Sequence, residues 1–189
     1  RRQAPRRQAR ARARVGDLAG AGEKSSARLD AVASAHGQKV LRTPVGEANV
    51  VEGILEARAR IGGEGNGGVI LPALHLGRDA PVGLALILTG LATRRLALSQ
   101  WAGELPALVM LKEKVELSAE PRWEAAEASV GRLLENPEID RRDGLRLARG
   151  TEWVHLRKSG TEPIIRVIAE APSRERAEAL LGAARTALS

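Results

Sequence analysis

The sequence predicts two small domains in succession: an α/β domain with a mixed sheet, then a small α+β domain with an antiparallel sheet and two helices. Helical periodicity alternates with short apolar runs up to about residue 105, whereas several strands follow one another beyond residue 108. The chain has 189 residues, of which 43% are apolar, and this is sufficient for two modest cores. We therefore expect the domains at residues 25–107 and 108–189.

The first domain shows alternating helices and strands. In order, we expect a helix at residues 26–36, a strand at 38–41, a helix that ends near residue 60, a strand at 69–71, a helix at 80–92 and a short helix at 98–105. Gly37 can end the first helix, and Thr43 with Pro44 indicates a turn before the second. The helix at 80–92 is strongly apolar, so we expect it to be buried on more than one side.

The second domain shows a pattern dominated by strands. The predicted elements are strands at residues 109–117, 145–148, 153–156 and 164–169, with helices at 122–135 and 173–188. From this order of elements we expect an α+β unit in which one antiparallel sheet carries both helices.

A candidate phosphate loop joins two of these strands. Residues 157–166 read Arg-Lys-Ser-Gly-Thr-Glu-Pro-Ile-Ile-Arg. A phosphate dianion offers only acceptors, so it is bound by backbone N–H groups in a tight turn, by hydroxyls and by arginine forks. The candidate residues are Arg157, Ser159, Gly160, Thr161 and Arg166. The same segment also fits an ordinary hairpin turn whose arginines solvate the strand ends, and these residues alone leave both interpretations open.

A second loop upstream carries five glycines in seven positions, residues 62–68. Glycines permit unusual backbone angles and the close approach of a ligand. The two other residues, Glu64 and Asn66, are hydrogen-bonding groups suited to neighbouring sugar hydroxyls. A flexible entry to the strand at 69–71 is the alternative interpretation. Together with the phosphate loop, this loop suggests a sugar phosphate as the ligand.

These segments, taken together, resemble the alpha-D-phosphohexomutase family. The resemblance rests on residues 42–47 (Arg-Thr-Pro-Val-Gly-Glu), the glycine loop, residues 77–79 (Gly-Arg-Asp) and residues 157–163, whose order and spacing match the C-terminal half of the family. The sequences of these motifs are most similar to those of its phosphoglucosamine mutase and phosphomannomutase branches. The resemblance runs from about residue 25 to the C-terminus, and it implies the family's third domain followed by its small fourth domain.

The resemblance also implies roles. Arg157, Ser159, Gly160 and Thr161 match the family's phosphate-binding positions, whereas Arg166 either reaches the phosphate or flanks a strand. Glu64 and Asn66 match positions that contact the sugar, although many relatives carry serine where Asn66 stands. The ligand would be a hexose phosphate, of glucosamine or mannose, that the intact enzyme interconverts between its 6- and 1-phosphates.

The family's phosphoserine loop and aspartate-rich magnesium loop do not occur in this sequence. We therefore expect a fragment that recognises the sugar and its phosphate, with no catalytic residue, metal ligand or cofactor of its own, while magnesium belongs to the intact enzyme. A non-catalytic sugar-phosphate-binding module is the alternative. The sequence predicts no oligomeric state and leaves the choice of hexose open.

Charge is concentrated at the N-terminus. Residues 1–14 contain seven of the 30 Lys and Arg residues and no acid, and the remaining 23 equal the 23 Asp and Glu residues. We expect residues 1–24 to be a disordered Arg-rich tail. An RNA-binding role for it is a weaker alternative, because the tail lacks aromatics that stack on bases, so we do not expect nucleic acid as a partner.

Composition also limits the setting. The chain has no cysteine for disulfides or thiolate metal sites, and no apolar run near 20 residues for a membrane span. A cytoplasmic protein fits this composition best.

Overall fold

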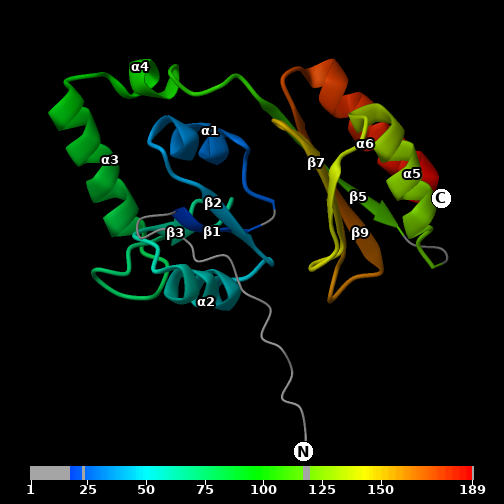
Figure 1. Ribbon diagram of the computed structural model, residues 1–189, viewed down its shortest axis with the longest axis horizontal. Coiled ribbons are helices and arrows are strands. Elements are labelled where there is room, and N and C mark those ends of the chain that lie inside the picture. Colours follow the sequence, from blue (N-terminus) through cyan, green and yellow to red (C-terminus); the bar gives the residue numbers. More distant parts are fainter. Residues whose placement is uncertain (1–17, 23, 117–119, 189) are drawn as a thin grey trace, which may run out of the picture.

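The computed structural model describes residues 18–22, 24–116 and 120–188, which form two domains joined by an extended segment between α4 and β5 (Figure 1). The predicted fold class is confirmed: a mixed sheet with helices comes first, and an antiparallel sheet with two helices follows.

The first domain is built on a sheet with the strand order β2-β1-β3-β4. Strand β1 pairs in parallel with β2 and β3, whereas β3 and β4 are antiparallel. Helices α1 and α2 lie on opposite sides of this sheet (Figure 1), and α2 supplies Val50, Ile54 and Ala57 to a small core. The elements are β1 (Leu18–Gly22), α1 (Arg28–Ala35), β2 (Val40–Thr43), α2 (Glu47–Ala57), β3 (Gly62–Gly63), β4 (Val69–Ile70), α3 (Ala80–Arg94) and α4 (Leu98–Ala102).

Strand β1 lies within the segment that we assigned to the disordered tail. It occupies the middle of the sheet, between β2 and β3, so the first domain includes residues from Leu18 onward. Its sequence, Leu-Ala-Gly-Ala-Gly, lacks the large alternating apolar residues that reveal a strand, and glycine disfavours strands in general. The rest of the predicted tail, residues 1–17, lies outside the described residues.

The prediction that the apolar helix is buried on several sides is wrong. None of the residues of α3 is buried, and Leu84 and Leu88 are more than half exposed. Among the described elements, its main packing partner is the two-residue strand β4, and Gly90 lies against the ring of Trp101 of α4. The helix therefore presents an apolar surface to the outside of the described chain.

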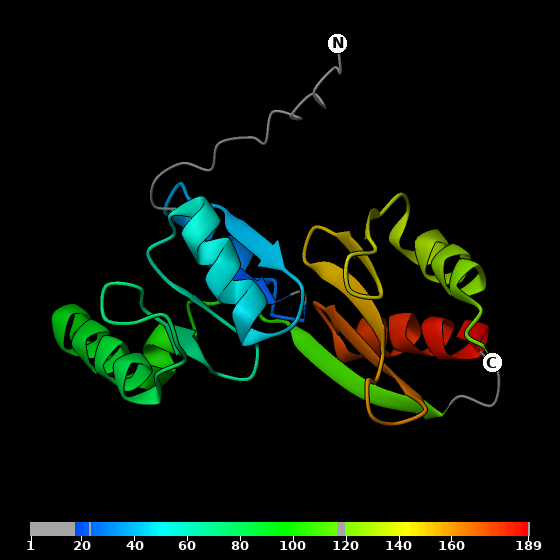
Figure 2. The ribbon, with the colours of Figure 1, turned by 90° about the horizontal axis from the view of Figure 1, so that it is seen from below.

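The second domain has a sheet with the strand order β5-β9-β8-β7-β6, in which all neighbours are antiparallel. Figure 2 shows α5 and α6 together on one face of this sheet, with the first domain beyond the other face. Apolar residues of the strands and of both helices form the main core of the protein between them. The elements are β5 (Val109–Glu116), α5 (Trp123–Leu134), β6 (Glu138–Asp140), β7 (Leu145–Arg149), β8 (Glu152–Lys158), β9 (Ile164–Ala171) and α6 (Arg174–Leu188).

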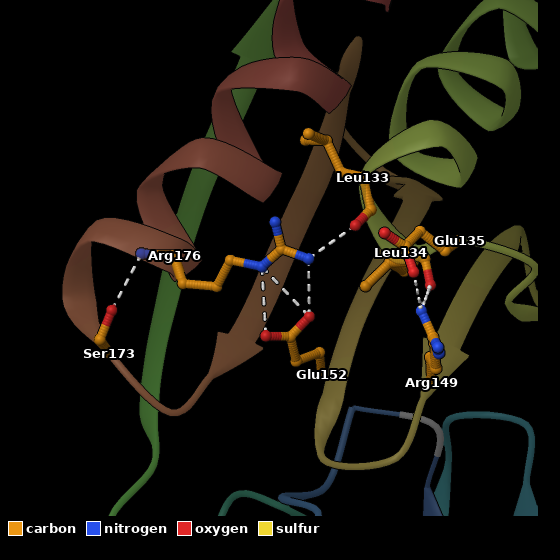
Figure 3. Close-up of polar contacts among 7 residues, drawn as sticks. All are labelled: Leu133, Leu134, Glu135, Arg149, Glu152, Ser173 and Arg176. Atoms are coloured by element: carbon orange, nitrogen blue, oxygen red, sulfur yellow. Dashed lines mark hydrogen bonds and ion pairs between the residues drawn. The ribbon is translucent and has the colours of Figure 1, made fainter.

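A polar clamp holds the two helices to the sheet (Figure 3). The Arg176 guanidinium, near the start of α6, binds the Glu152 carboxylate at 2.9–3.1 Å and donates to the Leu133 carbonyl of α5 at 2.6 Å. Ser173 accepts from the Arg176 backbone N–H and so caps α6. One side chain thus fixes the end of α5, the start of α6 and the start of β8 together.

The other face of the antiparallel sheet is divided between two environments. Toward one end, Trp153 and Ile168 pack with Ala27, which immediately precedes α1 of the first domain. The buried Glu170 carboxylate accepts from the Ala27 backbone N–H at 2.7 Å and from the Trp153 indole N–H at 2.8 Å. These contacts bury one part of the sheet face against the first domain and leave the other part to line a cleft.

Candidate binding cleft between the domains

A cleft of about 450 Å³ lies between the two domains and contains residues from both predicted loops. The first domain contributes Lys24, Val45, Gly65 and Asn66 to its walls. The second domain contributes side chains from β5, β8 and β9, principally Lys112, Lys114, His155, Arg157 and Arg166. The structure thus brings the glycine loop and the two candidate phosphate arginines to one site, although they are far apart in the sequence.

Three cations stand in a row across the sheet. Arg166 of β9 is paired in register with Arg157 of β8 on one side and with Lys114 of β5 on the other. Residues directly opposite on antiparallel strands project from the same face, with Cβ atoms about 5 Å apart, and like charges in such positions repel. This arrangement is favourable when an anion neutralises it, so the row is suited to a phosphate group.

Two acidic residues partly balance these cations. Asp143 accepts a hydrogen bond from Arg157 Nε at 2.6 Å. Glu162, at the tip of the β8–β9 turn, lies 3.5 Å from Arg166 and 3.6 Å from Lys114, and all three of these side chains are largely exposed. Exposed pairs at such distances hold side chains only weakly, so Arg166 and Lys114 can turn toward a ligand.

The remaining residues of the phosphate loop lie beside the cleft and are not part of its walls. Ser159 is partly buried, and its backbone N–H donates to the Ile164 carbonyl at 2.9 Å, which closes the turn. Gly160 and Thr161 are exposed. A Cβ at Gly160 would meet nothing within 4 Å, so there is open space above the turn.

The glycine loop presents its two polar side chains differently. Asn66 lines the cleft, and its Oδ1 accepts from the Gly68 N–H at 3.2 Å, which leaves its amide group for another partner. Glu64 does not line this cleft, and its side chain is only 5% exposed. It accepts from the Gly46 N–H at 3.1 Å and pairs with Arg78 at 3.6 Å.

Arg78 braces the glycine loop from behind. Its Nε and backbone N–H donate to the Glu47 carboxylate at 2.8 and 2.9 Å, and these hydrogen bonds hold the pKa of Glu47 below its usual value. A Cβ at Gly68 would lie 2.3 Å from Arg78 Cδ, so the arginine packs directly against the loop backbone. The loop geometry therefore depends on Arg78 as well as on its own glycines.

His155 lies at the floor of the cleft and is buried, with 2% of its surface exposed. Burial is the main cause that lowers its pKa below 6.5. The ring is then neutral at pH 7, and its Nε2–H donates to the Asp143 carbonyl at 2.7 Å. In this form it adds a polar contact to the cleft without adding charge.

Sequence reasoning missed five polar residues that line the cleft: Lys24, Lys112, Glu113, Lys114 and His155. The mixed charges of residues 112–116 are typical of a solvated strand face. A signal was present, because Lys112 and Lys114 alternate with Leu111 and Val115, so they share one face of β5. The register with β9, which the sequence does not reveal, places that face at the cleft.

Neither a cluster of metal-ligand side chains nor a membrane-spanning helix is found among the described residues. They contain no cluster of three or more His, Asp, Glu or Cys side chains that could hold a metal ion. The part of the chain that the structure describes also has no helix with the length and apolar character needed to cross a bilayer.

Comparison with known families assigns both domains of the chain. The model of phosphoglucomutase/phosphomannomutase α/β/α domain III matches residues 9–109, and that of the C-terminal domain of the same enzymes matches residues 112–187. The chain belongs to the phosphoglucomutase/phosphomannomutase family, which confirms the resemblance seen in the sequence.

Individual relatives agree with this assignment. The chain is 40% identical over 155 residues to a phosphoglucomutase/phosphomannomutase of Thermococcus kodakarensis, a match that covers 81% of this chain and 34% of the relative. It is 37% identical over 153 residues to a protein of Methanopyrus kandleri named a probable phosphoglucosamine mutase, with 80% of this chain and 34% of the relative covered. The chain thus spans about a third of the length of these curated relatives.

A solved structure shares the fold. Aspergillus fumigatus N-acetylphosphoglucosamine mutase, in complex with GlcNAc-6P and magnesium, aligns with a TM-score of 0.67 at 16% identity. The alignment covers 93% of this chain and 39% of that protein.

Proposed function

We propose that this chain binds a hexose phosphate, of glucosamine or mannose, in the cleft between its two domains. One observation carries the proposal: Asn66 of the glycine loop and the opposed pair Arg157 and Arg166 line the same cleft. A cavity that contains both anion-binding arginines and a side chain that can hydrogen-bond to hydroxyls matches the two ends of a sugar phosphate. The named GlcNAc-6P complex of a protein with the same fold supports this class of ligand.

In this proposal, the phosphate lies over the cationic row, where Arg157, Arg166 and Lys114 supply donors. Ser159, Gly160 and Thr161 contribute hydroxyl and backbone N–H groups at the open side of the turn. The sugar extends toward Gly65 and Asn66, which line the same cleft of about 450 Å³. Glu64 acts on the sugar through the loop that it holds in place, and it contacts a hydroxyl directly only if its side chain leaves Gly46.

Within an intact mutase, this part of the chain would recognise the phosphate that is not reacting. Binding energy gained far from the chemistry positions the reacting end of the substrate. The activity to which it would contribute is the interconversion of hexose 6-phosphate and 1-phosphate in the cytoplasm. In this proposal magnesium belongs to the intact enzyme.

Calorimetric titration of the purified chain with glucosamine 6-phosphate and mannose 6-phosphate tests the proposal. We expect saturable binding that is lost in Arg157→Ala and retained in Arg174→Ala, an exposed arginine on α6 that pairs with Glu178. Unphosphorylated glucosamine serves as the third ligand and should not bind. A folded chain that binds neither sugar phosphate would refute the proposal for these two domains alone. Affinity for RNA that falls steeply with salt would instead support the Arg-rich tail as the functional segment.

A further inference from the structure

We propose that Asp143 is a positioning residue that orients the phosphate-binding Arg157 and connects it to the sugar side of the cleft. The inference rests on the proposed function. The Asp143 carboxylate lies between the two domains and accepts hydrogen bonds through both of its oxygens. Oδ1 accepts from Arg157 Nε at 2.6 Å, and Oδ2 accepts from the Val45 backbone N–H of the first domain at 2.9 Å.

The position of Asp143 is fixed by its own backbone. Its carbonyl accepts from His155 at 2.7 Å. The next residue, Gly144, has a φ of +90°, and a Cβ there would lie 2.2 Å from the Leu156 carbonyl oxygen. Only glycine fits such a position, because the turn lies directly against the backbone of β8. The carboxylate, whose side chain is 15% exposed, is thus held in one place from both sides.

The contact with Arg157 leaves that arginine able to bind a ligand. Guanidinium has five N–H donors in a fixed plane, and Asp143 uses only the one on Nε. Orienting the group through Nε aims the two terminal nitrogens as a fork, the geometry in which arginine binds phosphate. The Arg157 side chain remains 42% exposed, so the fork is accessible from the cleft.

The contact with Val45 reaches the glycine loop through one more residue. Val45 and Gly46 donate their consecutive backbone N–H groups to two different carboxylates, those of Asp143 and Glu64. A continuous series of hydrogen bonds therefore runs from Arg157 through Asp143 and the backbone at residues 45–46 to the base of the glycine loop. Movement of one domain relative to the other would break this series at Asp143.

The sign of the change in phosphate affinity on removal of Asp143 distinguishes a purely electrostatic effect from a positioning role. A carboxylate beside a phosphate site repels the ligand, so its removal would strengthen phosphate binding if charge were its only effect. If Asp143 instead positions Arg157, its removal weakens binding. A hydrogen bond to a charged group contributes enough to change affinity by about tenfold or more.

The first experiment compares the affinity of glucosamine 6-phosphate for the wild-type chain, Asp143→Asn and Asp140→Asn. Asp140 is a matched control, because it also accepts from an arginine side chain and from a backbone N–H, those of Arg142, and does not line the cleft. We expect Asp143→Asn to lose about tenfold or more in affinity. The control should change by less than about twofold, the scale of a surface charge. Equal or tighter binding by Asp143→Asn would overturn the inference and leave the proposed function intact.

A second experiment does not depend on the ligand. In NMR spectra of the amide groups, Arg157→Ala should shift the Val45 signal in the wild-type background and leave it unchanged in the Asp143→Asn background. A Val45 signal that is insensitive to Arg157 in both backgrounds would refute the connection. If the wild-type chain binds no sugar phosphate, the proposed function fails, and this measurement still decides whether Asp143 joins the two sides.

Discussion

Replacement of Glu170 by methionine tests how the two domains are held together. Glu170 is 1% exposed, and its Oε2 alone accepts from the Ala27 N–H of the first domain and the Trp153 indole N–H of the second. Methionine has nearly the same volume but no acceptor that replaces a carboxylate. The variant therefore leaves two buried donors without a partner and avoids the creation of a large cavity.

The expected cost follows from these two donors. Each unsatisfied buried N–H costs about 1–3 kcal/mol, which sums to about 2–6 kcal/mol. Removal of a buried carboxylate recovers part of this, because burying the charge was itself unfavourable, so we expect a net loss of about 2–4 kcal/mol. With a denaturant slope near 2 kcal/mol per molar urea, the unfolding midpoint falls by about 1–2 M.

Urea unfolding followed by far-UV circular dichroism measures this shift. Glu178→Met, at an exposed position of α6, is the control for the chemical change and should move the midpoint little. Glu170→Gln keeps an acceptor and should lose less than Glu170→Met. In a Trp153→Phe background, which lacks one donor, Glu170→Met should cost about half as much. A loss below about 1 kcal/mol in Glu170→Met, with an unchanged slope, would refute the role assigned to these hydrogen bonds.

Three further outcomes are expected. Because burial holds the His155 pKa below 6.5 in the folded state, the unfolded chain binds the proton first as pH falls. The free energy of unfolding should therefore decline below about pH 6.5. His155→Gln should flatten this decline in urea titrations at about pH 5.5–7.5. Gly182→Ala in α6 should raise the unfolding free energy by about 1 kcal/mol in thermal scans, because a Cβ there meets nothing within 4 Å. Gly63→Ala should lower the unfolding free energy, because the new Cβ would lie 2.2 Å from the Gly68 carbonyl oxygen. Arg78→Ala should speed amide hydrogen exchange at residues 64–68, and Arg94→Ala should not.

The fold could be predicted largely because its elements carry strong local signals. The helix α5 repeats buried Ala126, Val130 and Leu134 at intervals of four residues, which is the period of a helix face. Strands β8 and β9 are apolar runs separated by a turn containing Gly160 and Pro163. Strands β1, β3 and β6 were not predicted. Glycine and alanine give β1 and β3 no alternation, β6 has only three residues, and β1 and β3 form through pairing with neighbours that are distant in the sequence.

The site was only partly visible for a related reason. Chemical type predicted Arg157 and Asn66 as candidates, since arginine forks and amide groups suit a sugar phosphate, and both residues line the cleft. Burial and strand register decided which other residues line the cleft. Glu64 is 5% exposed, bonds to Gly46 and does not line it, whereas pairing with β9 places Lys114 beside Arg166. Asp143 precedes a glycine in a segment that is typical of an ordinary turn, and its proposed role depends on a hydrogen bond from Val45 that no local pattern reveals.

The two halves of one sheet face would link the proposed binding to the contact between the domains. At one end the face is apolar and buried, with Trp153 and Ile168 against Ala27, so it fixes the domains to each other. At the other end the same strands carry Arg157 and Arg166, which repel each other and gain from an anion. If a phosphate binds as proposed and draws these side chains together, it acts on strands whose opposite ends hold the first domain. Ligand binding in the cleft should therefore depend on both domains, and the second domain alone should lose the contribution of Val45 and Asn66.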